Sequence, residues 1–228
     1  MLLELSYPFG GDEPKWPTNP NDSYVWDNAT RRGDSCNAST IRHHMHNGTH
    51  VDAPRHFTMD GRTIDQIPIE DFCYRSPLVV KIPKAKGGRI TKEDLLPYAE
   101  PLASCDLLLV YTGYADLREQ DPHAFIDDFP CWGVDAAQYL RRQCPKLKAV
   151  AMDVLSVDSC TTGADEGFPA HHAFLDVNEE HPERTLLLFE DVNTKKLFEA
   201  EKPAKTVFAF PVRFKGLEAA PIAMVAEL

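Results

Sequence analysis

The sequence predicts a mixed α/β fold built as one domain over residues 1–228. From Pro77 onward, short apolar runs of strand length alternate with segments of helical spacing, which is typical of strands and helices that pack in layers. The chain is long enough for one large core, and no internal repeat, low-complexity stretch or convincing linker divides it. Together these observations favour a single mixed α/β domain.

The individual elements are expected from local patterns. Residues 2–7 alternate enough to form a strand, and a long irregular loop should follow because glycine and proline recur from Gly10 to Pro20. Thr91 is a good helix N-cap with two acidic residues after it, and residues 134–143 have the apolar spacing and basic end of a surface helix. Six apolar segments are expected to be strands: 78–82, 106–112, 147–152, 185–189, 206–213 and 221–227.

Three large aromatic residues, Trp16, Tyr24 and Trp26, belong to the predicted loop region. They could form the wall of a pocket for a flat substrate, or they could simply pack against the domain. The sequence leaves both interpretations open.

Charge and cysteine content restrict the class of protein. A formal net charge of -11 argues against a nucleic-acid backbone or an anionic membrane as the main partner. No apolar run approaches the roughly 20 residues of a membrane span, and the N-terminus does not resemble a signal peptide. From these two observations we expect a cytoplasmic enzyme. The six cysteines form no C-x-x-C pair, so we expect them to be free thiols.

The stretch from His46 to His56 is the densest group of potential ligands in the chain. A glycine, two β-branched residues and a proline within it favour extended chain over helix. Side chains alternate in extended chain, so residues of one parity could face one point if the backbone bends at Gly48 and Pro54. The residues of that parity are His46, His50, Asp52 and His56. This segment predicts half of a metal site, with His43 and His44 expected to be non-ligands.

The other half should come from the later part of the chain. His171 and His172 follow a turn-prone segment, and Glu190 and Asp191 end the predicted strand over 185–189. Imidazole and carboxylate ligands without thiolates suit Zn²⁺, Mn²⁺ or Fe²⁺ and leave room for a bound water. Hydrolysis is the chemistry that such a site performs most readily.

The pattern His46-x-Gly-Thr-His50-x-Asp52-x-Pro-x-His56 resembles the signature of the cyclase-like metal-dependent hydrolase family, which includes bacterial kynurenine formamidase and isatin hydrolase. Five further segments support the resemblance over nearly the whole chain. They are Ser76-Pro-Leu-Val-Val, Leu109-Val-Tyr-Thr-Gly113, Asp153-x-x-Ser156-x-Asp158, His171 with Phe174-Leu175, and Leu188-Phe-Glu190-Asp-Val-Asn.

The resemblance implies a central mixed β-structure of swivelling β/β/α type with outer helices, and a homo-oligomer. It implies one or two divalent ions, Zn or Mn. Asp52 could bridge two ions, and His56 would move protons. The implied metal ligands are His46, His50, Asp52, His171 and Glu190.

One departure concerns the segment between the last two ligands. Residues Asp176 to Arg184 add an acidic loop that the formamidases lack, and this weakens the substrate assignment more than the metal assignment. The loop offers Glu183 as a rival to Glu190, and His172 is a rival to His171. We expect Glu190 and His171 to be the ligands.

The function expected from this resemblance is hydrolysis of an aryl formamide such as N-formylkynurenine, which gives formate and the free amine. Hydrolysis of a cyclic amide such as isatin is the alternative within the family. A non-catalytic binding protein that retains the fold is the alternative from another class. A closed structural metal site is disfavoured because such sites are usually rich in cysteine.

Overall fold

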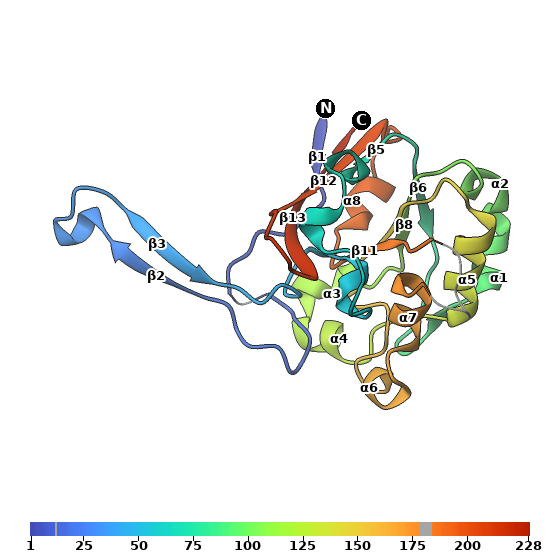
Figure 1. Ribbon diagram of the computed structural model, residues 1–228, viewed down its shortest axis with the longest axis horizontal. Coiled ribbons are helices and arrows are strands. Elements are labelled where there is room, and N and C mark those ends of the chain that lie inside the picture. The colour runs from blue at the N-terminus through green and yellow to red at the C-terminus, as the bar shows by residue number, and fades with distance from the viewer. Residues whose placement is uncertain (12, 178–183) are drawn as a thin grey trace.

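The structure is a computed structural model that describes residues 1–11, 13–177 and 184–228. Its centre is a mixed sheet with nine strands among these residues, and most of the helices cover one side of it (Figure 1). The strands of this sheet are β1 (Leu2–Glu4), β4 (His50–Asp52), β5 (Cys73–Tyr74), β6 (Pro77–Lys81), β8 (Leu107–Tyr111), β10 (Ala149–Met152), β11 (Leu187–Glu190), β12 (Thr206–Pro211) and β13 (Ala219–Glu227). The predicted mixed α/β fold with a central β-structure is therefore confirmed.

The sheet curls until its two edges lie beside each other. The strand order is β5-β12-β13-β4-β11-β10-β8-β6, with β1 added on β13. Its end strands, β5 and β6, are separated in the chain by only Arg75 and Ser76. The Asp106 carboxylate accepts hydrogen bonds from both of their backbone N–H groups, at 2.7 and 2.9 Å. The result is a nearly closed, barrel-like sheet.

The strands fall into a parallel and an antiparallel half. The parallel half consists of β6, β8, β10 and β11. Strand β4 pairs antiparallel with both β11 and β13. Strand β4 therefore joins the two halves. In its register with β11, His50 lies opposite Glu190, so two segments 140 residues apart in the chain meet at the middle of the sheet.

The helices are short except for α5, which occupies the predicted range Val134–Gln143. Thr91 caps α1 as expected, through a capping box with Asp94. The remaining helices are α1 (Lys92–Leu95), α2 (Ala99–Leu102), α3 (Ala115–Gln120), α4 (Pro122–Ile126), α6 (Gly163–Glu166), α7 (Pro169–Leu175) and α8 (Thr194–Phe198). Among the described residues, no helix is long and apolar enough to cross a bilayer.

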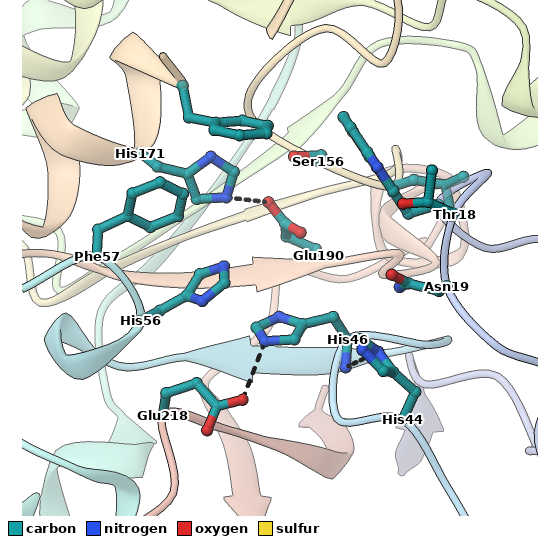
Figure 2. A pocket seen from close by; sticks show the side chains of 13 residues that line it. Thr18, Asn19, His44, His46, His56, Phe57, Ser156, His171, Glu190 and Glu218 are labelled. Atoms are coloured by element: carbon teal, nitrogen blue, oxygen red, sulfur yellow. Dashed lines mark hydrogen bonds and ion pairs between the residues drawn. The ribbon is translucent and has the colours of Figure 1, made fainter. Parts of the chain in front are cut away.

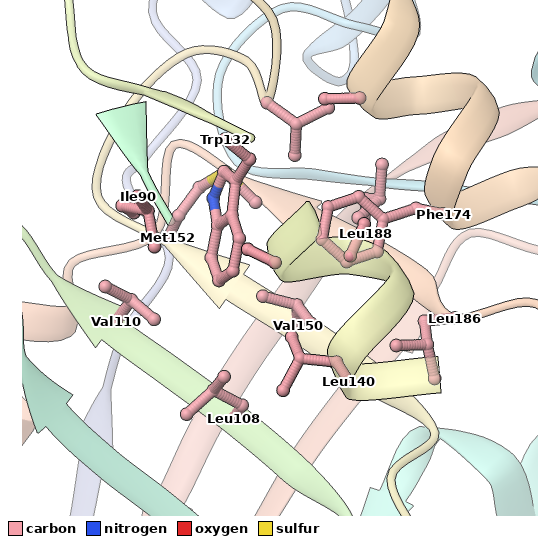
Figure 3. Close-up of a cluster of buried hydrophobic side chains, with 14 of the residues drawn as sticks. Ile90, Leu108, Val110, Trp132, Leu140, Val150, Met152, Phe174, Leu186 and Leu188 are labelled. Atoms are coloured by element: carbon pink, nitrogen blue, oxygen red, sulfur yellow. The ribbon is translucent and has the colours of Figure 1, made fainter. Parts of the chain in front are cut away.

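Two hydrophobic cores lie on opposite faces of the parallel strands. Alternate residues of β8 divide between them, with Leu108 in the core beneath the helices and Leu109 in the core inside the curled sheet. In the first core, Trp132 packs edge-on against Phe174 of α7, with ring centroids 5.4 Å apart (Figure 3). Burial on both faces explains why β8 reads as an unbroken apolar run.

One large feature differs from the prediction. Instead of an irregular loop, residues after 22 form an antiparallel hairpin of β2 (Ser23–Asn28) and β3 (Ala38–Arg42), with the single-turn helix η1 (Thr30–Arg32) near its tip. The hairpin extends far from the rest of the molecule (Figure 1). A second small pair, β7 (Arg89–Ile90) and β9 (Cys131–Trp132), is parallel. All six cysteines are free, as expected.

Candidate metal centre

The segment from His46 to His56 has the bent, extended form that its sequence predicts. Gly48 bends the chain through a left-handed conformation with φ of +63°, and a Cβ at this position would lie 2.7 Å from the Phe9 ring. Strand β4 follows, and the single-turn helix η2 (Pro54–His56) then turns the chain back. These two bends allow side chains before and after β4 to reach the same space.

Asp52 is the centre of the cluster. Its side chain is fully buried, and its carboxylate lies 3.0 Å from Nδ1 of His46 and 3.4 Å from Nε2 of His50. His171 approaches the other carboxylate oxygen at 3.8 Å. Glu190 lies opposite, 3.4 Å from Nε2 of His50 and 3.6 Å from Nε2 of His171. All five residues named as ligands from the sequence therefore converge.

The rival residues do not join this cluster. His172 follows His171 on α7, but its side chain is 43% exposed and its Nδ1 pairs with Asp176 at 2.6 Å. A helix turns by about 100° per residue, so neighbouring histidines cannot point the same way. Glu183 lies outside the described residues, as does most of the Asp176 to Arg184 segment.

Hydrogen bonds fix which nitrogen of two imidazoles faces the centre. Nδ1 of His50 donates to the carbonyl oxygen of Gly48 at 2.8 Å, and Nδ1 of His171 donates to the Asp158 carboxylate at 2.6 Å. Asp158 is itself held by the backbone N–H groups of Ala170 and His171. Both rings therefore present Nε2 inward, an arrangement typical of metal-binding histidines.

His46 is oriented the other way. Its Nε2 donates to Glu218, just before β13, at 3.3 Å (Figure 2). Its Nδ1 faces Asp52. Glu218 thus fixes the orientation of the His46 ring by a hydrogen bond, as the Gly48 carbonyl does for His50 and Asp158 does for His171.

The electrostatics of the cluster favour the ionised form of Asp52. Burial alone would raise the pKa of Asp52, but the imidazoles of His46, His56 and His50 hold it well below its ordinary value. Burial conversely lowers the pKa of His46, whereas Asp52 and Glu218 raise it to about 9. The pKa of His50 is also raised, through Asp52 and Glu190 against the effect of burial. In the metal-free protein, a raised pKa of this kind means that the proton on His46 offsets part of the buried negative charge near pH 7.

The donor set fits a divalent metal ion. Nε2 of His50 and both carboxylate oxygens of Asp52 are buried and make no hydrogen bond of good geometry, although imidazole nitrogens lie 3.0 to 3.8 Å from the two oxygens. Buried polar atoms are normally satisfied, so three orphaned atoms at one point indicate a missing partner. Single ligand atoms of His50, Asp52 and Glu190 lie within 4.8 Å of one another, as do those of His46, Asp52 and His56. Asp52 belongs to both groups, which suits a bridging carboxylate.

His56 is closer to the cluster than the sequence suggested. Its ring stacks on His46 with centroids 4.1 Å apart and meets His171 edge-on at 5.5 Å. Burial, followed by the neighbouring histidines His46 and His171, lowers the pKa of His56 to about 3, although Asp52 acts in the opposite direction. The imidazole is therefore neutral near pH 7. It could accept a proton, and it is also near enough to bind an ion directly.

A cleft of about 380 Å³ opens above these residues (Figure 2). Trp16, Phe57 and Phe168 supply aromatic walls, and Phe57 stacks on His171 with centroids 4.5 Å apart. The expectation of a pocket wall holds for Trp16. It is wrong for Tyr24 and Trp26, which lie on the exposed hairpin strand β2.

The two histidines expected to be non-ligands lie beside the site. His43 pairs with Asp22 at the base of the hairpin, and His44 lines the cleft. Two supporting residues had no role assigned from the sequence. Asp158 was visible as part of the Asp153-x-x-Ser156-x-Asp158 segment, whereas Glu218 precedes a strand and has no pattern that would reveal it.

Comparison with known proteins found similar sequences and similar folds. A family model described as "Putative cyclase" matches residues 3–159. An uncharacterised protein of Haemophilus influenzae is 38% identical over 120 residues, or 51% of this chain and 84% of that protein. A kynurenine formamidase of Bacillus mycoides is 27% identical over 170 residues, 75% of each chain. Isatin hydrolase A from Labrenzia aggregata shares the fold, with a TM-score of 0.81 at 18% identity over 99% of this chain and 93% of that one.

Proposed function

We propose a function from one premise: the chain belongs to the cyclase family, whose model matches residues 3–159. The function is metal-dependent hydrolysis of a small aromatic amide, with an aryl formamide such as N-formylkynurenine as the substrate. One observation carries this proposal: three imidazoles and two carboxylates come together at the floor of an aromatic cleft. Several of their buried polar atoms make no hydrogen bond. The 27% identity to a kynurenine formamidase supports the substrate class.

In this proposal His46, His50, Asp52, His171 and Glu190 hold one or two ions of Zn or Mn. Imidazole and carboxylate donors without thiolate suit both metals. The ion would supply Lewis acidity, which polarises a carbonyl group and makes water more acidic. Asp158, Glu218 and the Gly48 carbonyl hold the imidazole ligands in the required orientation.

His56 is the proposed general base and acid. Its ring faces the cleft and stacks on His46, so it is placed to take a proton from the attacking water as the new C–O bond forms. The C–N bond of the amide then breaks, and His56 returns the proton to the amine nitrogen. An aryl formamide gives formate and an arylamine, with the water oxygen retained in formate.

The aromatic walls orient the substrate. Trp16 and Phe168 lie at the cleft with ring centroids 6.1 Å apart, and Phe57 lies 5.7 Å from Phe168. A flat ring held among them would place its amide over the ligands below, since apolar walls with a few polar groups are typical of small-molecule sites.

Hydrolysis of a cyclic amide such as isatin is the second candidate, supported by the shared fold with isatin hydrolase A. It would open the ring and yield an acid. The two candidates differ in their products, because only the formamide releases formate.

The proposed function is tested by loading the protein separately with Zn and Mn and supplying N-formylkynurenine or isatin. Release of formate that stops after chelation is expected. Ring opening of isatin without formate release from the formamide would favour the second candidate. Tight binding of both compounds with no turnover by either metal form would indicate a non-catalytic binding protein and contradict the proposal.

A further inference from the structure

Two of the proposed metal ligands are followed or preceded by buried polar residues that the proposed reaction does not use. Thr49 precedes His50 in the chain, and Asp191 follows Glu190. His50 and Glu190 lie opposite each other as the last registered pair between β4 and β11. Thr49 and Asp191 are almost completely buried, at 0% and 1% exposure. They therefore lie where the ladder between the two ligand strands ends, and where strands fray most readily.

The Thr49 hydroxyl joins the two ligand segments directly. Its Oγ1 donates to the backbone carbonyl oxygen of Asp191 at 2.7 Å, across 142 positions of the chain. The same oxygen accepts a hydrogen bond from the backbone N–H of Tyr7 at 2.9 Å. The hydroxyl thus acts as a donor and as an acceptor at once. This pair of bonds ties the residue before His50 to the residue after Glu190.

Asp191 has a backbone conformation that needs support. Its φ is +51°, in the left-handed region that residues other than glycine adopt at an energetic cost. Its carboxylate accepts two hydrogen bonds from the Arg118 guanidinium, both at 2.7 Å, and its backbone N–H donates to the carbonyl of Val154 at 2.8 Å. Two parallel bonds between a guanidinium and a carboxylate fix geometry as well as charge. The turn directly after Glu190 is therefore held in one conformation.

The same contacts close into a ring. The Arg118 guanidinium, on α3, lies over the aromatic ring of Tyr7 with its carbon 3.6 Å from the centroid. Tyr7 in turn donates to Thr49, and Thr49 donates to Asp191. Arg118 is only 8% exposed, so water competes little with its charged partner. We refer to Tyr7, Thr49, Arg118 and Asp191, which come from four separate segments of the chain, as the clamp.

We propose that the clamp is a positioning device for the metal centre, which fixes the separation of His50 and Glu190 so that both reach one ion. This inference rests on the proposed function, because it requires these two side chains to be ligands. Single ligand atoms of His50, Asp52 and Glu190 lie within 4.8 Å of one another, and the clamp holds the ends of the two strands that carry them. The clamp residues act through the ligands, so they are positioning residues.

The test measures the Zn²⁺ affinity of the full chain by isothermal titration, beginning from chelated protein. Thr49→Val keeps the shape of the side chain but removes the hydroxyl, and it should weaken Zn²⁺ binding by about 10- to 100-fold, as loss of an outer contact to a ligand does. The visible absorption of the Co²⁺-loaded variant should also change, because it reports the geometry of the ligands. Thr49→Ser keeps the hydroxyl and should bind Zn²⁺ like the wild type.

Thr194→Val is a matched control. Thr194 is also fully buried, and its hydroxyl donates to the backbone carbonyl of Val110 at 3.0 Å, outside the clamp. Its replacement should lower the melting temperature of the protein without changing its Zn²⁺ affinity or its Co²⁺ spectrum. The comparison separates the positioning of ligands from a general loss of stability.

The charged pair of the clamp is tested by removing both partners together. Loss of Arg118 alone would leave the Asp191 carboxylate buried without a partner. The double variant Arg118→Met with Asp191→Asn leaves no buried charge, and asparagine tolerates the left-handed conformation. Its Zn²⁺ affinity should fall about tenfold or more, with circular dichroism verifying that it is folded during the titration.

The possible results distinguish this inference from the metal site on which it rests. A wild-type protein that binds Zn²⁺ together with a Thr49→Val variant that binds it equally well would overturn the clamp and leave the metal centre in place. The same holds for a double variant with wild-type affinity and an unchanged Co²⁺ spectrum. A wild-type protein that binds no Zn²⁺ would contradict the metal centre and the clamp with it.

Discussion

Replacing Asp52 with asparagine should remove the group that organises the metal centre. Asparagine has nearly the same shape, and Asp52 is fully buried, so the variant should fold with its strand β4 in place. The change removes a negative charge that lies 3.0 Å from His46 and 3.4 Å from His50. It therefore tests the electrostatic role of Asp52 separately from its packing.

The size of the effect follows from the state of His46 in the metal-free protein. Its pKa of about 9 compares with an ordinary 6.5, even though burial acts to lower it. That difference corresponds to roughly 3 kcal/mol of preference for the protonated ring. Asp52 is the largest favourable contributor. In Asp52→Asn we expect the pKa of His46 to fall to 6.5 or below, and metal affinity to drop at least about 100-fold.

Two measurements check this prediction. An NMR titration of the chelated protein follows the His46 ring, and elemental analysis after dialysis reports bound metal. An Asp71→Asn variant, altered at a carboxylate that pairs with Lys148 away from the cluster, serves as a matched control. The reasoning would be refuted if Asp52→Asn kept its full metal content and the His46 ring still titrated near pH 9.

Three further predictions concern the neighbouring residues. His56→Ala should retain its metal while turnover falls by about 10²- to 10⁴-fold; loss of metal instead would make His56 a ligand. In the metal-free protein, the raised pKa of His46 contributes stability that is complete below about pH 6.5 and is lost as the pH rises through about 9. Chemical denaturation at a series of pH values should show that decline, and a flat profile would contradict it. Glu218→Gln retains an oxygen that can accept from Nε2 of His46, so it should bind metal more tightly than Glu218→Ala, and isothermal titration with Zn²⁺ compares the two.

The near half of the candidate site could be predicted from the sequence because its residues are local. His46, His50, Asp52 and His56 lie within eleven residues, and their common parity depends only on extended geometry and two bends. For the far half, His171 and Glu190 were the expected residues, with His172 and Glu183 as rivals. Pairing of β4 with β11 sets Glu190 opposite His50, and the direction of α7 turns His171 inward and His172 outward. Both depend on tertiary structure, which a local pattern does not contain.

The surroundings of Tyr24 and Trp26 and the role of Glu218 could not be predicted, for the same physical reason. For Tyr24 and Trp26 the sequence left two interpretations open, a pocket wall and packing against the domain, and their exposed position on the hairpin strand β2 fits neither. Glu218 is separated from His46 by 172 residues in the chain, and a carboxylate before a strand is usually solvated. In both cases the local residue types were compatible with several environments, and only the packing of distant segments decides among them.

The central claim is that five side chains hold a catalytic metal: those of His46, His50, Asp52, His171 and Glu190. Anomalous X-ray diffraction from crystals of the Zn-loaded protein tests it most directly. The account predicts at least one strong peak within about 2.0–2.2 Å of an Asp52 oxygen and of a His46 or His50 nitrogen, which is the usual zinc–ligand distance. A fully loaded crystal with its zinc only at other positions on the protein would contradict it.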